Sequence, residues 1–226
     1  MRLIRRYWFV TLFVIEICLV IAHYLWGKQS RMFDLDEERN LASLFSSVQL
    51  WFVATGAGII AWLGGRIGWL RRVRIAWLGV TFLFGYLAID ELASLHEAIG
   101  AKINTAFHLF TSPSASFNWV LFLMPLEVVA ISILLIVLIH THRILPSVAK
   151  WFALGLGGMA SVLLIEFLSG TFLYDSGRAL GKGWWYWQSV VVEELVEMVA
   201  VTCMLVGVVR VLSFLVKKYI RINLEN

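Results

Sequence analysis

Residues 75–99 read IAWLGVTFLFGYLAIDELASLHEAI. An apolar helix of this length can cross the roughly 30 Å hydrocarbon core of a bilayer. Its second half carries four ionisable residues: Asp90, Glu91, His96 and Glu97. At about 100° per residue, Asp90, Ser94 and Glu97 share a sector about 60° wide. Ionisable groups inside a membrane helix are costly and usually serve a function. We therefore predict a spanning helix with one polar face.

The composition of the whole chain indicates a membrane protein. Of its 226 residues, 60% are hydrophobic and 15% are charged, against about 45–50% and 25% in a soluble domain. The net charge of +4 comes from short basic clusters between apolar runs, a pattern that does not indicate nucleic-acid binding. We predict an all-α, polytopic integral membrane protein.

Six apolar runs are long enough to span a membrane. A run that follows Arg2, Arg5 and Arg6 is too long for a signal peptide and lacks a small-x-small cleavage site, so we expect it to remain as the first span. Small residues in the second span, including Gly56, favour close helix packing. The chain is predicted to form a single six-helix domain, with spans at residues 7–26, 41–63, 75–99, 118–142, 149–174 and 186–212.

The basic residues predict the orientation. With these spans, 13 of the 19 Lys and Arg residues lie on the side of the two termini. Cytoplasmic segments carry the excess of basic residues. Both termini are therefore expected in the cytoplasm, with the protein in the plasma (inner) membrane.

A second group of acids, Glu193, Glu194 and Glu197, lies in the last span. Its members share one helix face, as do those around Asp90, and we expect the third and sixth spans to be neighbours with these faces meeting. Glu166 of the fifth span lies at a similar depth. Glu16 and Glu127 stand alone near the middle of their spans, where a carboxyl group can link helices by hydrogen bonds.

These acids need compensation within the protein. Eight deep acids exposed to lipid would cost on the order of 20 kcal/mol, at roughly 2.5–3.5 kcal/mol each. The interiors of the predicted spans contain no Lys or Arg, which excludes ordinary salt bridges. Three alternatives remain: protonated carboxyl groups that hydrogen-bond to each other, bound metal ions, or a water-filled cavity.

We favour a divalent-metal site in the outer half of the bilayer. Oxygen-rich ligation suits Mg²⁺, Ca²⁺ or Mn²⁺, and Fe or Zn would fit better with an imidazole ligand. The candidate metal ligands are Asp90, Glu91, Glu166, Glu193, Glu194 and Glu197, with His96 and Glu97 at the rim.

Known catalytic motifs do not identify a reaction. The chain has no E-x-x-H, H-E-x-x-H or G-x-S-x-G sequence, so neither a di-iron bundle, a zincin nor a serine hydrolase is indicated. Whether the protein is an enzyme is left open by the sequence; a catalytic site of this kind would be a metal-dependent one that acts on a lipid-soluble substrate. The alternatives are a cation- or proton-coupled transporter or channel that uses the same carboxylates, and a non-catalytic membrane subunit. Membrane lipid is the expected partner, with a second copy of the chain or another membrane protein as alternatives.

Overall fold

The computed structural model describes residues 4–36, 39–96, 98, 99, 102, 119–168 and 184–225. In this part of the chain, six helices are long and apolar enough to cross a membrane, which confirms the all-α class and the six apolar spans. A short 3-10 turn, η1 (Arg31–Phe33), lies between the first two. The six helices are α1 (Ile4–Trp26), α2 (Leu41–Arg66), α3 (Arg71–Ala93), α5 (Trp119–Ile144), α6 (Pro146–Leu168) and α8 (Trp184–Glu225).

Local sequence explains several helix ends. The Asn40 side chain accepts a hydrogen bond of 2.8 Å from the Ser43 amide and so caps the start of α2. The turn between α2 and α3 contains Gly68 at φ 79°, a conformation that glycine adopts without a steric penalty. α6 begins at Pro146, where the missing N–H of proline is not needed.

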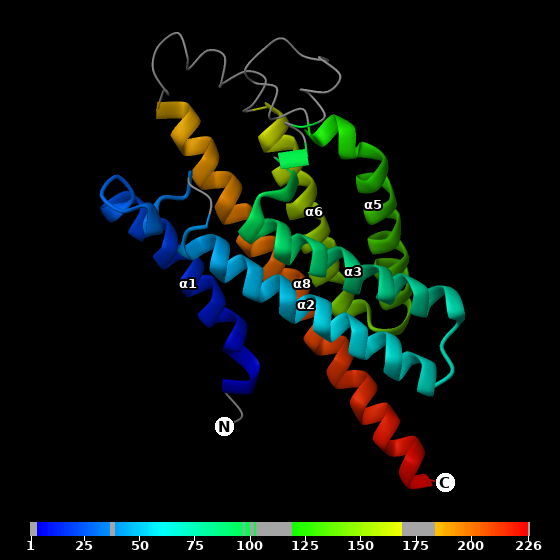
Figure 1. The fold of residues 1–226 in the computed structure, drawn as a ribbon. Coiled ribbons are helices and arrows are strands. Elements are labelled where there is room, and N and C mark those ends of the chain that lie inside the picture. Colours follow the sequence, from blue (N-terminus) through cyan, green and yellow to red (C-terminus); the bar gives the residue numbers. More distant parts are fainter. Residues whose placement is uncertain are drawn as a thin grey trace.

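Five helices form a closed ring. α2 packs against α3 and α8, α6 packs against α8, and α5 closes the ring by packing against α3 and α6. α1 lies outside this ring, mainly against α8 (Figure 1). Both termini lie toward the lower end of the molecule in this view, as do the α2–α3 and α5–α6 connections.

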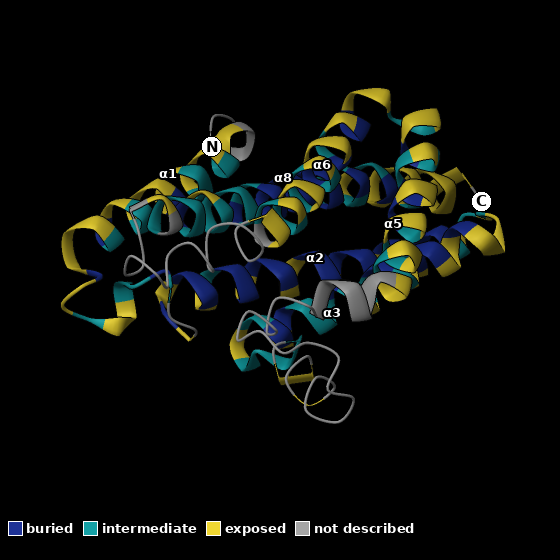
Figure 2. Cartoon of the chain, turned by 90° about the horizontal axis from the view of Figure 1, so that it is seen from above, coloured by how far each residue is buried: buried dark blue, intermediate teal, exposed yellow. Residues whose placement is uncertain are grey.

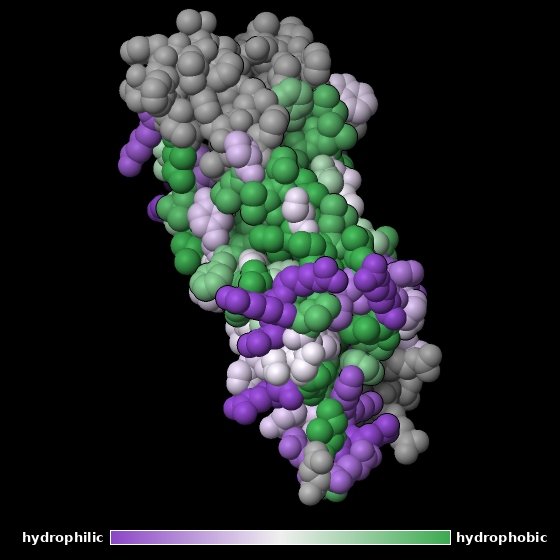
Figure 3. Space-filling model, turned by 90° about the vertical axis from the view of Figure 1, so that its right-hand side faces the viewer, coloured by the Kyte–Doolittle hydropathy of each residue, from purple (hydrophilic) through white to green (hydrophobic). Residues whose placement is uncertain are grey.

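The core is centred on α2 and α8, which carry more buried residues than the other helices (Figure 2). Large buried side chains include Trp77 and Phe84 of α3 and Met204 of α8. Gly56 packs directly against Val208, so α2 and α8 approach closely there, as the small residues of the second span predicted. On the face that Figure 3 shows, apolar side chains cover a broad region above the middle, and hydrophilic residues gather from the middle toward the lower end.

Two predicted spans differ from the helices of the structure. The third was predicted to continue to residue 99, but α3 ends at Ala93 because Ser94 adopts a left-handed conformation, with φ 49° and ψ 46°. The sixth was predicted to end at residue 212, but α8 continues to Glu225 and has 42 residues. Hydropathy finds the apolar part of a helix and does not detect a polar extension of it. Residues 169–174 of the predicted fifth span lie outside the described residues.

The third and sixth spans are not the packed neighbours that we predicted. α2 packs extensively on both α3 and α8, and among the described residues α3 and α8 have no comparable contact with each other. The prediction assumed that the two acidic faces would hide each other from lipid. Instead, the small residues of α2 allow this helix to fill the space between them.

Candidate functional site

The end of α3 positions a carboxylate and an imidazole against each other. Asp90 is buried in the last turn of α3. The Ser94 amide donates a hydrogen bond of 2.7 Å to the Asp90 carbonyl oxygen, and the chain then leaves the helix direction. This turn brings His96 back over Asp90. The His96 amide donates to Oδ1 of Asp90 at 2.8 Å, and the ring nitrogen Nδ1 lies 2.7 Å from Oδ2.

This pair determines how His96 can act chemically. An ionised carboxylate only accepts hydrogen bonds, so the short contact assigns the ring proton to Nδ1. The lone pair of the imidazole is then on Nε2, the atom that acts as a base or binds a metal. The side chains of His96 and Asp90 are 22% and 11% exposed, so the pair is largely shielded from solvent.

On one continuous helix, His96 would lie about 120° around the axis from Asp90, so the sequence did not predict that the two side chains meet. Residues six positions apart on a helix do not meet. The left-handed Ser94 removes that restriction. A serine in this conformation is uncommon, and the sequence around it has no Gly or Asn that would indicate a helix end.

A second imidazole lies at the end of α1. His23 Nδ1 accepts a hydrogen bond of 3.1 Å from the Leu35 amide and lies 3.5 Å from Oδ1 of Asp34. Here Nδ1 is an acceptor, so the ring is neutral with its proton on Nε2. Close by, the Tyr24 hydroxyl donates to Oε1 of Gln188 at 2.7 Å and links α1 to α8. His23 thus connects α1 to the segment that follows it.

The acids of α8 are half-buried near the beginning of that helix. Glu193, Glu194 and Glu197 all have intermediate exposure, as does Glu91 at the end of α3. Each of these four side chains has an interaction partner. Within the described part of the chain, no three His, Cys, Asp or Glu side chains come together closely enough to hold a metal ion. The side chains of Glu97 and Glu166, the other two predicted ligands, lie outside the described residues.

A separate polar cluster links three helices inside the bundle, and we call it the Glu16 cluster. Oε1 of Glu16 accepts a hydrogen bond of 2.5 Å from the Thr202 hydroxyl. The Gln49 amide group donates to Thr202 Oγ1 at 2.6 Å and reaches Glu16 Oε1 at 3.4 Å. All three side chains are buried, and Glu16 is 0% exposed.

The Glu16 cluster confirms the predicted linking role of Glu16, since it joins α1 to α2 and α8. Oε2 of Glu16 and Oε1 of Gln49 have no hydrogen-bond partner in the described structure. Sequence reasoning missed Gln49 and Thr202, because uncharged polar residues are common in spans and neither forms a motif with Glu16. Glu127, the other isolated acid, has a buried Oε1 without a partner among the described residues.

Comparison with known proteins shows which family the chain belongs to and assigns no activity to it. No curated protein and no solved structure significantly matches the chain. The model of a family described as "Domain of unknown function (DUF8692)" matches residues 8–212. That range contains most of α1, the pair Asp90 and His96, and the acids of α8. Because the match covers most of the sequence, the chain belongs to the DUF8692 family.

Proposed function

We propose that this multi-pass membrane protein binds a divalent cation at the end of the bundle where α3 ends and α8 begins. His96 supplies an imidazole ligand through Nε2, and carboxylates from the predicted set supply oxygen ligands. The observation that carries this proposal is the contact of 2.7 Å between His96 Nδ1 and Asp90 Oδ2. A histidine that binds a metal generally donates its other ring N–H to a carboxylate or carbonyl group, which sets its orientation and raises its basicity.

This arrangement gives Asp90 a different role from that of the other acids. Both of its oxygen atoms receive hydrogen bonds from His96, so Asp90 orients the imidazole. In this proposal the oxygen ligands are drawn from the other predicted acids, Glu91, Glu97, Glu166, Glu193, Glu194 and Glu197. Those among them that the structure describes would have to approach His96 when the cation binds, because their side chains do not form a metal-binding group in the structure. One nitrogen among several oxygen ligands favours Mn²⁺, Fe²⁺ or Zn²⁺ over Ca²⁺ or Mg²⁺.

A cation at this place suits a metal-dependent reaction on a lipid-soluble substrate. A bound divalent ion lowers the pKa of a coordinated water and polarises ester or phosphate oxygens. Substrate would enter from the bilayer, since the helices present apolar side chains to it. The excess of basic residues on the side of the termini supports a plasma-membrane protein with both termini in the cytoplasm, which puts the site in the outer half of the bilayer.

The alternative, a transporter or channel, needs a polar path that continues through the membrane. The carboxyl group of Glu16 supports a one-sided site instead. Glu16 is fully buried and hydrogen-bonded to Thr202, which is an arrangement for packing helices and not for hydrating an ion. The pair of His96 and Asp90 remains the place where we expect either a reaction or ion loading to occur.

Elemental analysis of the purified protein tests whether it binds a divalent cation. The wild type should contain one or two divalent ions per chain, and His96→Ala should lose most of this metal. His142→Ala is the matched control, because His142 is an exposed histidine in the last turn of α5 and is not part of the proposed site. A wild type that is metal-free and gains no thermal stability from added Mn²⁺, Fe²⁺ or Zn²⁺ would contradict the proposal.

A further inference from the structure

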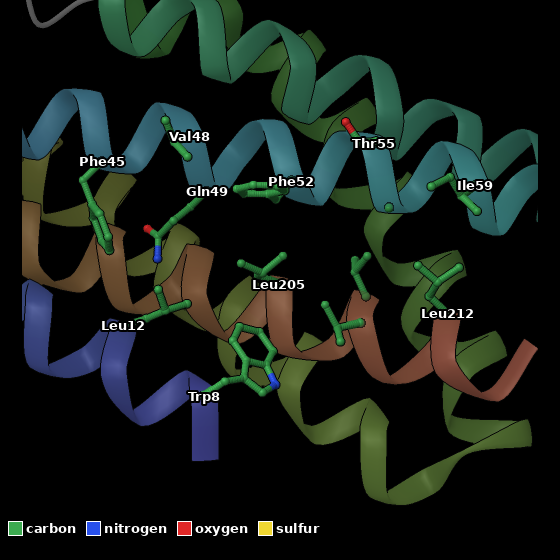
Figure 4. Close-up of a pocket in the computed structure, with 13 residues that line it drawn as sticks. Trp8, Leu12, Phe45, Val48, Gln49, Phe52, Thr55, Ile59, Leu205 and Leu212 are labelled. Carbon is green, nitrogen blue, oxygen red and sulfur yellow. The ribbon is translucent and has the colours of Figure 1, made fainter. Parts of the chain in front are cut away.

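A groove runs along the surface between α1, α2 and α8, and we call it the α1 groove. Its volume is about 480 Å³, within the range of roughly 300–1,000 Å³ that is usual for ligand pockets. Figure 4 shows Phe52 and Ile59 of α2 facing Trp8 of α1 and Leu212 of α8 across it. Gln49 and Thr55 are the polar residues of a lining that is otherwise apolar.

Most of the length of the α1 groove corresponds to the depth of one lipid leaflet. Its lining on α2 runs from Phe45 to Ile59, which is about 21 Å along the helix, and the part between Gln49 and Ile59 covers about 15 Å. Half of the hydrocarbon core of a bilayer is also about 15 Å thick. An extended chain that enters beside Ile59 would therefore end near Gln49, where the Glu16 cluster begins.

The cross-section of the α1 groove distinguishes an acyl chain from a helix. Spread over about 21 Å, a volume of 480 Å³ leaves a mean cross-section of roughly 23 Å². An α-helix is about 10–12 Å in diameter and needs about 80 Å² or more. The groove is thus too narrow to take in the body of a helix from a partner or from a second copy, and its width suits a hydrocarbon chain.

A cationic and aromatic group lies beyond the Ile59 end of the groove. Trp62 follows Ile59 by three residues and so lies on the same side of α2. Its ring centroid is 6.5 Å from that of Tyr219 on α8, and the Arg66 guanidinium lies 5.5 Å from the Trp62 ring. Trp and Tyr are enriched at the membrane–water boundary, and arginine binds phosphate through two parallel hydrogen bonds.

We infer that the α1 groove binds an anionic phospholipid from the leaflet on the Arg66 side. One acyl chain lies between α1, α2 and α8, and the phosphate group lies at Arg66. Charge complementarity selects an anionic headgroup, because Lys217, Lys218 and Arg221 follow on the exposed end of α8. The bound chain fills the space between α1 and α2 and stabilises the attachment of α1.

Native mass spectrometry of the full-length protein tests this inference. Protein in detergent is titrated with dioleoyl phosphatidylglycerol or with dioleoyl phosphatidylcholine, and lipid adducts are counted. Arg66→Gln should weaken phosphatidylglycerol binding about tenfold, which corresponds to roughly 1.4 kcal/mol, and Arg71→Gln is the matched control. Thr55→Trp should block the groove, since Thr55 is exposed and lines it. Leu44→Trp changes an exposed position of α2 outside the groove.

The inference is supported if phosphatidylglycerol binds in preference to phosphatidylcholine and both test variants reduce its adducts while the controls do not. Equal binding of the two lipids would overturn it. Unchanged phosphatidylglycerol adducts in Thr55→Trp would also overturn it. The same spectra report dimers, and a dimer that Thr55→Trp abolishes, without any lipid adduct in the wild type, would assign the groove to a second copy of the chain instead.

Discussion

The carboxylate of Asp90 holds the imidazole ring of His96 at Nδ1, with 2.7 Å between the two atoms. The two residues meet because α3 ends at Ala93 and the left-handed conformation of Ser94 turns the chain away from the helix direction. The left-handed conformation of Ser94 thus places the imidazole of His96 against the carboxylate of Asp90. In the proposed cation site, this contact gives Asp90 the role of orienting the ring of His96.

Asp90→Asn should weaken this arrangement. An amide has one acceptor oxygen where the carboxylate has two, so one of the two bonds from His96 is lost. We expect a loss of about 1–3 kcal/mol in stability, as for a buried hydrogen bond to a charged group. If His96 binds a metal, the metal content should fall as well. Thermal unfolding measures the stability, and elemental analysis measures the metal content. An Asp90→Asn protein that equals the wild type in both would show that the contact between Asp90 and His96 contributes neither to stability nor to metal binding.

Ser94→Gly should stabilise the protein, because only glycine adopts the left-handed conformation without a steric cost of about 1–2 kcal/mol. Ser94→Val should destabilise it, since a β-branched side chain is least tolerated there. Ser132→Gly is the control: Ser132 is exposed within α5, and glycine inside a helix costs about 0.5–1 kcal/mol. The same substitution is therefore expected to raise the melting temperature at one position and lower it at the other.

Thr202→Val should destabilise the attachment of α1. Valine has the shape of threonine but no hydroxyl group, so Glu16 loses its donor at 2.5 Å. Hydrogen bonds between membrane helices contribute about 0.6 kcal/mol on average and at most about 1.7 kcal/mol, and the expected loss lies in this range. Thr202→Ser keeps the donor and is the control. Equal unfolding of the two variants would show that the hydroxyl group does not matter.

Two adjacent glycines of α6 should respond oppositely to alanine. A Cβ atom at Gly158 would lie 2.7 Å from the Cβ of Ala200 on α8, whereas a Cβ at Gly157 would meet nothing within 4 Å. Gly158→Ala should cost about 1–3 kcal/mol through overpacking. Gly157→Ala should be neutral or stabilising by up to about 1 kcal/mol. Unfolding of both variants in the same detergent makes the comparison, and a tolerated Gly158→Ala would mean that α6 and α8 can move apart.

Topology reporters test the proposed orientation. Fusions after Asn226 and within the α2–α3 turn should report the cytoplasm, and a fusion at Lys102 should report the opposite side. The prediction follows from the basic residues that cluster on the side of the termini. A translocated C-terminus would contradict it and would move the site at His96 to the inner half of the bilayer.

Much of the fold could be predicted because it depends on local and cumulative properties. Each span is an apolar run whose free energy of transfer into lipid is a sum over its own residues, and the ends of α2 and α6 follow from Asn40 and Pro146. The same sums indicate that the acids must lie inside the protein. Hydropathy therefore sufficed for the number and the approximate limits of the helices, and the basic clusters predict their orientation.

Only the tertiary structure decided which of these helices are neighbours and which polar groups meet. Contacts between membrane helices depend on shape and on a few hydrogen bonds, and neither can be summed along the chain. For this reason α2 lies between α3 and α8 where contact between their acidic faces was predicted, and Glu16 meets Gln49 and Thr202 from two other helices. The pair of Asp90 and His96 depends on one backbone conformation at Ser94, which is held by the surrounding structure because serine has no intrinsic preference for it.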